Sequence, residues 1–185
     1  MFSTLRYVNQ PALSTVAKSF VNNGVAKRGM SIAALNAFEG KHFISIDQLS
    51  NEELRGLLDL SKKYRDTYGK QSSVDPVTAP KPLTGQSVSM IFQKRSTRTR
   101  VSTETGMTLL GGQSLFLGPS DIQLGVNESM RYTALVLGRF NSIVLARVFS
   151  HDDVLELSKH ATVPVINALS DLHHPLQTLA DLMAL

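Results

Sequence analysis

The chain has 185 residues, of which 42% are apolar and 18% charged, so it can bury the core of one ordinary domain. No apolar run approaches the ~18 residues of a membrane span, and we expect no membrane insertion. Cysteine is absent, which excludes disulfides and thiolate chemistry, and the five histidines lack metal-binding spacing, so we expect no metal site.

The net charge of +4 is confined to the first segment. Residues 1–38 contain four basic side chains and no acidic one, and the first acidic residue is Glu39. The remaining chain has 15 basic and 15 acidic side chains, so it is neutral. A neutral body without tryptophan, and a basic run without interleaved aromatic residues, argue against nucleic-acid binding.

Residues 1–31 are rich in hydroxyl and amide side chains and carry spaced basic residues. Their apolar residues form no continuous block, which is typical of an organelle transit peptide and not of a secretory signal. We therefore expect import into the mitochondrial matrix and removal of the segment near Lys27 to Ser31. Plastid import and a disordered tail without an address are the alternatives.

The first half of the remaining chain predicts a helix, a loop, a strand and a second helix. The helix lies within residues 45–69, where Ser50 and Glu53 have capping-box spacing and Gly69 follows the last periodic residue. A proline-containing loop leads to a buried strand at 86–92. The second helix runs from Thr97 to Leu110 and is stopped by Gly111 and Gly112.

The second half alternates strands and helices in the same way. We predict strands at 114–118, 142–146 and 163–167. A helix at 127–140 has Asn127 as its expected N-cap, and Ser150 with Asp153 marks the start of a helix that ends near His160. The last helix begins at Pro175, which suits the first helical position.

Short apolar strands that alternate with helices indicate an α/β fold, a doubly wound, mainly parallel four-stranded sheet flanked by helices. In such sheets ligands bind beyond the carboxyl ends of the strands. Cationic and hydrogen-bonding residues follow each predicted strand: Ser96, Thr97, Arg98, Thr99 and Arg100 after the first, Gln123 after the second, Arg147 after the third, and His174 and Gln177 after the fourth, beyond Asn167 and Asp171.

These side chains suit a small anion. The hydroxyls lie at a predicted helix start, where free backbone N–H groups and the helix dipole favour negative charge. Arg98 and Arg147 carry planar guanidinium groups that match phosphate oxygens. No glycine or GKS sequence is present in this loop and no GxGxxG occurs, so nucleotide binding has no support.

Each residue also has an ordinary explanation. The hydroxyls suit helix caps, Arg147 suits a solvated or ion-paired side chain, and His174 suits a loop histidine before a proline. Their expected convergence at one edge of the sheet favours the anion site. The side chains of Lys94, Arg95 and Arg100 are assigned mainly to solvent.

Several segments resemble ornithine carbamoyltransferases, within the aspartate/ornithine carbamoyltransferase family: FQKRSTRTRVSTETGMTLLGG, DIQLGVNES, VLARV and SDLHHPLQTLADL. The resemblance covers about residues 38–185 and matches the carbamoyl-phosphate-binding half. STRTR is specific to the family, and HPLQ follows at the expected distance. The preference for ornithine rests on the basic residues before Ser96, on GVNES and on LAD, and aspartate carbamoyltransferase is the nearer enzymatic alternative.

The resemblance implies a role for each matching residue. In similar proteins the 96–100 loop holds the phosphate through hydroxyls, backbone N–H groups and Arg98. Arg147 bridges the phosphate and the carbamoyl oxygen, which Thr99 and His174 also reach, and Gln177 holds the carbamoyl amide. The counterpart of Gln123 comes from a neighbouring subunit of a homotrimer. The implied reaction of arginine biosynthesis converts carbamoyl phosphate and ornithine to citrulline and phosphate, without cofactor or metal.

Similar proteins continue into a second α/β domain that binds the amino acid and carries an HCLP motif. The sequence ends at Leu185 without a cysteine, so we expect this second domain to be absent and the ornithine site to be incomplete. The expectation is a fragment or first-domain product with negligible turnover alone. A regulatory domain that assembles with full-length subunits is the alternative from another class, and a nucleic-acid patch at Lys94 to Arg100 is the weaker one.

Overall fold

The structure is a computed structural model that describes residues 38–69, 72–75, 77–121 and 129–185. In chain order, the described elements are the 3₁₀ turn η1 (Ile46–Gln48), α3 (Asn51–Tyr68), β1 (Ser87–Phe92), α4 (Thr97–Leu109), β2 (Gln113–Leu117), α5 (Met130–Phe140), β3 (Ile143–Arg147), α6 (His151–His160), β4 (Val165–Leu169) and α7 (Pro175–Ala184). Within these ranges, no helix is both long and apolar enough to cross a bilayer.

The four strands form one parallel sheet in the order β2-β1-β3-β4. The segment before η1 extends the sheet beyond β4, because the Phe43 N–H donates to the Val165 carbonyl at 2.8 Å and the Phe43 carbonyl accepts from the Asn167 N–H at 2.8 Å. The chain passes from β1 to β2 on one side and then returns across β1 to reach β3 on the other side. The strand order therefore reverses direction between β1 and β3.

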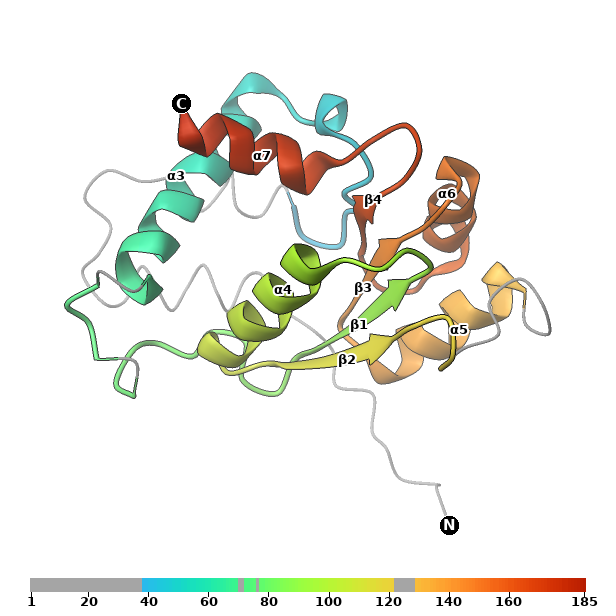
Figure 1. Ribbon diagram of the computed structural model, residues 1–185, viewed down its shortest axis with the longest axis horizontal. Coiled ribbons are helices and arrows are strands. Elements are labelled where there is room, and N and C mark those ends of the chain that lie inside the picture. The colour runs from blue at the N-terminus through green and yellow to red at the C-terminus, as the bar shows by residue number, and fades with distance from the viewer. Residues whose placement is uncertain (1–37, 70–71, 76, 122–128) are drawn as a thin grey trace, which may run out of the picture.

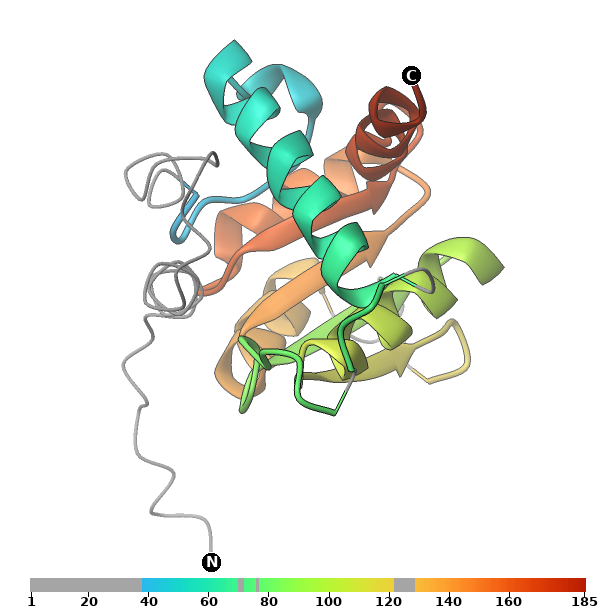
Figure 2. The same ribbon diagram turned by 90° about the vertical axis from the view of Figure 1, so that its left-hand side faces the viewer.

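Helices cover both faces of the sheet. Figures 1 and 2 show α4 and α7 on one face, with α3 packed against α7, and α5 and α6 side by side on the other face. The doubly wound α/β fold predicted from the alternation of elements is confirmed. In both views, the first turns of α4 and α7 lie at the edge where the strand arrows end.

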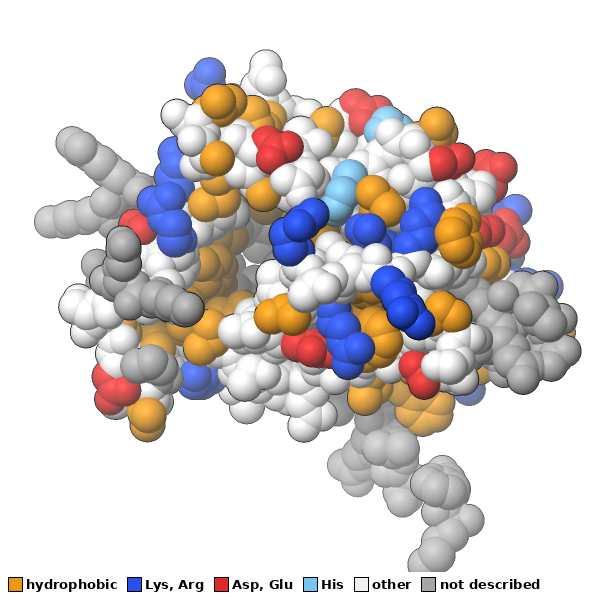
Figure 3. All heavy atoms as spheres, viewed as in Figure 1, with side chains coloured by type: hydrophobic (Ala, Val, Ile, Leu, Met, Phe, Trp, Pro, Cys, Tyr) orange, Lys and Arg blue, Asp and Glu red, His pale blue; other side chains and the backbone are white. Residues whose placement is uncertain are grey.

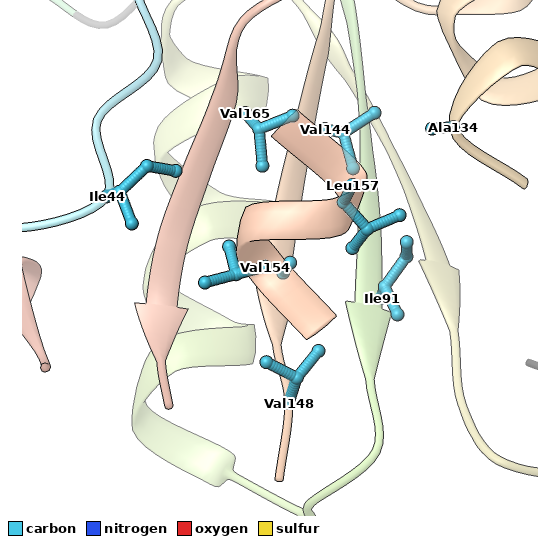
Figure 4. Close-up of a cluster of buried hydrophobic side chains, with 9 residues drawn as sticks. Ile44, Ile91, Ala134, Val144, Val148, Val154, Leu157 and Val165 are labelled. Carbon is cyan, nitrogen blue, oxygen red and sulfur yellow. The ribbon is translucent and has the colours of Figure 1, made fainter. Parts of the chain in front are cut away.

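Two apolar clusters stabilise this arrangement, one on each face of the sheet. The larger cluster joins β3 and β4 to α5 and α6, and Val154 and Leu157 of α6 have no exposed surface (Figure 4). The smaller cluster packs Met90 and Phe92 of β1 against the α4 and α7 side. Burial of one such side chain contributes roughly 1.5–3 kcal/mol, so the clusters hold the strand ends in fixed positions.

The helix boundaries follow from local sequence. In the predicted capping box, the Ser50 N–H donates to Glu53 Oε2 at 2.8 Å and the Glu53 N–H donates to Ser50 Oγ at 3.2 Å. At the end of α4, Gly111 has a φ of +84°. The Gly111 N–H donates to the Thr108 carbonyl and the Gly112 N–H to the Met107 carbonyl, which is the Schellman arrangement that the two glycines predict.

The observed boundaries differ most from the prediction at the fourth strand and at the helix before the third strand. The fourth strand starts at Val165, two residues later than expected, because Pro164 has no N–H to donate to a strand ladder. The helix expected from residue 127 has its described start at Met130, where Ser129 Oγ accepts from the Tyr132 N–H at 3.3 Å. Asn127, the expected N-cap, lies outside the described residues.

Candidate functional site at the carboxyl edge of the sheet

The strand order reverses between β1 and β3, and open α/β sheets bind ligands beyond the carboxyl ends of the strands at such a point. Phe92 and Arg147, the last residues of these strands, are partners in the ladder. The next residue, Gln93, donates its N–H to the Arg147 carbonyl at 2.9 Å. The loop that leads into α4 therefore starts beside Arg147.

The first turn of α4 offers free backbone N–H groups at this edge of the sheet. Ser96 is the N-cap, and its Oγ accepts from the Thr99 N–H at 3.3 Å. The Ser96 hydroxyl therefore acts as a helix cap. It satisfies only one of the N–H groups that the start of an α-helix leaves unpaired. No acidic residue lies in the first turn to offset the positive end of the dipole, and Arg98 adds a full charge there.

Arg147 is a half-buried cation without a counter-charge among the described residues. Its Nε is buried and has no hydrogen-bond partner in that part of the chain. Burial lowers the pKa of the guanidinium, and the charge of Arg98 lowers it further. A buried polar group that lacks a partner costs about 1–3 kcal/mol, and more when it is charged. An anion between Arg98 and Arg147 would relieve both the missing bond and the repulsion.

His174 lies at the start of α7, directly before the buried Pro175. Its imidazole forms no capping bond, and its Nδ1 is buried without a hydrogen-bond partner among the described residues. Burial lowers the pKa of His174, and the charge of Arg147 lowers it further, while Asp181 acts in the opposite direction. The imidazole is therefore neutral near pH 7 and can donate one hydrogen bond.

Thr99, Gln177, Arg100 and Gln123 differ in exposure and in their contacts. Thr99 is half-buried in the first turn of α4, while Gln177 is exposed and its Nε2 donates to Asp181 Oδ1 at 2.7 Å. Arg100 points elsewhere, since it pairs with Glu104 at 3.0 Å and lies 3.7 Å from the centre of the Phe116 ring. Gln123 lies outside the described residues.

The electrostatic links connect three turns that are far apart in sequence. The charge of Arg98 acts on Arg147, and that of Arg147 acts on His174. In Figure 3, Lys and Arg side chains gather with a histidine over the connection between β1 and α4 and beside the start of α7. No group of three metal-binding side chains occurs among the described residues. The arrangement suits a small anion with a polar group attached.

Two further residues support this edge: Gln93, which sequence reasoning missed, and Asn167, which it named at this edge without a role. The side chain of Gln93 joins two loops, because its Oε1 accepts from the Phe149 N–H at 2.6 Å and its Nε2 donates to Asp153 Oδ2 at 3.2 Å. Asn167 is fully buried and bonds to the turn before His174. In both cases a polar residue at or near the end of an apolar strand is the sequence feature that could have indicated a supporting role.

The fold and the site together define a doubly wound α/β domain with a cationic site where the strand order reverses. The family model described as "Aspartate/ornithine carbamoyltransferase, carbamoyl-P binding domain" matches residues 41–185, so the chain belongs to this family. This finding agrees with the resemblance inferred from the sequence.

Individual relatives agree with the family assignment. The chain is 46% identical over 147 residues to "Ornithine carbamoyltransferase" of Haloquadratum walsbyi, a match over 80% of this chain and 46% of the relative. It is 47% identical over 145 residues to "Ornithine carbamoyltransferase, chloroplastic" of Pisum sativum, over 78% of this chain and 37% of the relative. A solved mitochondrial ornithine carbamoyltransferase from Coccidioides immitis has a TM-score of 0.70 and 43% identity, over 78% of this chain and 45% of that one. The chain thus spans less than half the length of these relatives.

Proposed function

We propose that residues 38–185 form a domain that binds carbamoyl phosphate, as the carbamoyl-phosphate half of an ornithine carbamoyltransferase. The observation that carries this proposal is the pair of buried nitrogens, Arg147 Nε and His174 Nδ1, that lack hydrogen-bond partners among the described residues. Buried polar groups in native proteins are almost always satisfied, and a ligand bound beside these two side chains would supply the partners. Carbamoyl phosphate supplies a dianionic phosphate and a carbonyl oxygen on the carbon that is bonded to the bridging phosphate oxygen.

The proposed orientation places the phosphate at the start of α4. Backbone N–H groups, the hydroxyls of Ser96 and Thr97 and the guanidinium of Arg98 hold it there. Arg147 lies between the two ends of the ligand, and Thr99 and His174 donate to the carbamoyl oxygen. The Gln177 side-chain oxygen accepts from the carbamoyl amide, since its Nε2 is already bound to Asp181. Arg100 pairs with Glu104 of the same helix and lies over Phe116 of β2, and it is not assigned to the phosphate.

The proposed reaction needs no covalent intermediate. An uncharged δ-amine of ornithine attacks the carbamoyl carbon, the carbonyl oxygen gains negative charge, and the bond to the phosphate oxygen then breaks. The electron pair of this bond goes to the phosphate, the leaving phosphate takes the proton that the amine loses, and citrulline forms. Arg147, His174 and Thr99 stabilise the oxyanion, where loss of one donor can cost ~10²–10³ in rate. A neutral His174 serves as a hydrogen-bond donor in this scheme and not as a general base.

The ornithine site, the assembly and the location belong to the same proposal. Ornithine is bound by residues beyond those that form the carbamoyl-phosphate site. The enzyme is a homotrimer, in which Gln123 reaches the site of a neighbouring subunit. Two apolar side chains, Val101 of α4 and Leu115 of the edge strand β2, are exposed and support a covering partner. The composition of residues 1–31 supports import into the mitochondrial matrix, and a fusion of this segment to a fluorescent protein tests this against plastid import.

Calorimetric titration of the 185-residue chain with carbamoyl phosphate tests the binding function. We expect binding in the parent and a loss of at least about tenfold in Arg98→Ala and in Arg147→Ala, because a hydrogen bond to a charged group contributes roughly 1.5–3 kcal/mol. Arg139→Ala is the matched control, since Arg139 is exposed in the last turn of α5, away from the proposed site. Equal affinities in all four proteins would overturn the proposal.

A further inference from the structure

We propose that Asn167 is a positioning residue for His174, whose carboxamide fixes the bend between β4 and α7 and so sets the imidazole beside Arg147. This proposal rests on the proposed function, because it concerns the residue assigned to the carbamoyl oxygen. It assigns to Asn167 a role in selecting carbamoyl phosphate over phosphate, without contact to either ligand.

Asn167 is a buried amide whose side-chain nitrogen and oxygen both form hydrogen bonds. The side chain has no exposed surface. Its Nδ2 donates to the Ile44 carbonyl at 2.9 Å, and lies 3.3 Å from both Ser170 Oγ and the His173 carbonyl. Its Oδ1 accepts from the Leu169 N–H at 3.0 Å. One side chain therefore joins the segment beside β4, the strand itself and the turn that precedes His174.

The bond to Leu169 accounts for an irregularity in the sheet. Ala146 pairs with Asn167, but Arg147 pairs with Leu169, so Ala168 is an extra residue in β4. The Leu169 N–H bonds to the Asn167 side chain instead of the ladder, and the Leu169 carbonyl accepts from the Val148 N–H at 2.9 Å. Bulges of this kind occur next to active sites, where they redirect side chains. This one lies directly opposite Arg147.

The turn after the bulge is closed by a second set of bonds. The Ser170 N–H donates to the His173 carbonyl at 3.0 Å, and the His173 N–H lies 3.2 Å from Ser170 Oγ. The same hydroxyl lies 2.9 Å from His151 Nδ1 of α6. Because both backbone groups of His173 are held, the direction in which His174 leaves the turn is fixed. Ser170 and Asn167 thus act on the imidazole through the backbone.

The position of residue 167 requires a side chain that both donates to carbonyls and accepts from an N–H, which an amide does and a carboxylate of the same shape does not. Aspartate keeps the acceptor for the Leu169 N–H but presents an oxygen to the carbonyls of Ile44 and His173. A satisfied buried network of this type is sensitive to a single change, because each lost donor leaves a buried acceptor without a partner. A purely structural role would lower stability and weaken all ligands together. A positioning role would weaken selectively the contacts that His174 makes.

The test compares two variants and a matched control in the 185-residue chain. Asn167→Asp removes the donors, and Ser170→Ala removes the hydroxyl that holds the turn. Asn141→Asp is the control, since Asn141 is also a buried amide that donates to a backbone carbonyl, that of Leu137 at 3.1 Å, but it precedes β3 at the opposite end of the sheet. Each protein is titrated calorimetrically with carbamoyl phosphate and with inorganic phosphate, and His174 is titrated by NMR of its ring protons.

We expect Asn167→Asp and Ser170→Ala to bind carbamoyl phosphate about three- to tenfold more weakly, the range for loss of one neutral hydrogen bond. Their affinity for inorganic phosphate stays within about twofold of the parent, because the start of α4 is unchanged. The pKa of His174 rises toward its ordinary value as the imidazole leaves its buried position beside Arg147. Asn141→Asp changes none of these quantities.

Three results would overturn the proposal: an unchanged preference for carbamoyl phosphate in Ser170→Ala, an unchanged His174 titration, or an equal loss for both ligands. Ser170→Ala decides alone if Asn167→Asp does not fold, which thermal unfolding by circular dichroism reports. A parent without any preference for carbamoyl phosphate over phosphate would contradict the proposed function instead. In that case the His174 titration still decides whether Asn167 and Ser170 position the imidazole.

Discussion

Phe92 and Arg147 end two adjacent parallel strands in register, and the Arg147 carbonyl accepts from the N–H of the residue after Phe92 at 2.9 Å. This pairing places the cationic end of β3 beside the loop that starts α4. The convergence of the site therefore depends on strand order and register and not on the loops alone.

Gln93 extends this connection beyond the strands, and its removal is expected to loosen the site. Gln93→Ala breaks the bond to the Phe149 N–H, worth roughly 0.5–1.5 kcal/mol, and the bond to the Asp153 carboxylate, worth roughly 1.5–3 kcal/mol. We expect about a three- to tenfold loss of carbamoyl phosphate affinity together with a loss of about 2–4 kcal/mol of unfolding free energy. Calorimetry and urea denaturation measure the two effects. Gln113→Ala, at an exposed position that begins β2, is the control. An equal effect in both variants would show that the hydrogen bonds of Gln93 do not stabilise the site.

The stability of the chain is expected to fall as the pH is lowered below neutrality. His42 Nδ1 accepts from the Val165 N–H at 3.0 Å, and burial lowers the pKa of His42. The pKa of His174 is also lowered. Below the unfolded pKa of about 6.5 the unfolded chain binds these protons first, so the stability present above that pH is lost as the pH falls toward the folded values.

His42→Asn separates the contributions of His42 and His174 to this pH dependence, because asparagine offers a hydrogen-bond acceptor but does not titrate. Urea denaturation between about pH 7.5 and about pH 5, the range around the ordinary pKa of histidine, should show a shallower pH dependence in the variant than in the parent. His174 retains its share of the slope. Identical slopes in the two proteins would show that His42 does not contribute.

Gly106 inside α4 and Gly111 just beyond its end give a matched pair for backbone effects. Gly111 has a φ of +84°, and a Cβ there would lie 2.8 Å from Lys81 Cβ. Gly111→Ala is expected to cost about 1–3 kcal/mol, as for other residues forced into sparsely populated backbone regions. Gly106 lies inside the helix, where a Cβ would meet no described atom within 4 Å outside the helix backbone, so Gly106→Ala should stabilise by about 0.5–1 kcal/mol. Thermal and urea unfolding measure both, and a stabilised Gly111→Ala would contradict the helix-end geometry.

Local features of the fold were predictable because they depend on neighbouring residues. The Ser50 and Glu53 capping box and the stop at Gly111 were predicted from spacing alone. The strand order β2-β1-β3-β4 was not, because periodicity identifies a strand but not its neighbours. The late start of β4 reflects a proline that the apolar pattern hides.

The candidate site was predictable to a similar extent. The principle that ligands bind at the carboxyl ends of strands selected Arg98, Arg147 and His174; in the structure the charge of Arg98 acts on Arg147, and that of Arg147 acts on His174. Arg100 shows where the sequence was ambiguous, because its contacts with Glu104 and Phe116 depend on helix phase and on an adjacent strand. The supports at Gln93 and Asn167 required the fold, since each joins segments that are distant in sequence.

A double-mutant cycle on Arg98 and Arg147 tests the central claim that separate turns bind one small anion. Carbamoyl phosphate affinity is measured calorimetrically for the parent, Arg98→Ala, Arg147→Ala and the double variant. If both guanidinium groups bind the same ligand, the double variant should lose less than the sum of the single losses, by about 0.5–3 kcal/mol. Losses that add to within about 0.5 kcal/mol, as distant independent sites do, would contradict a shared anion site.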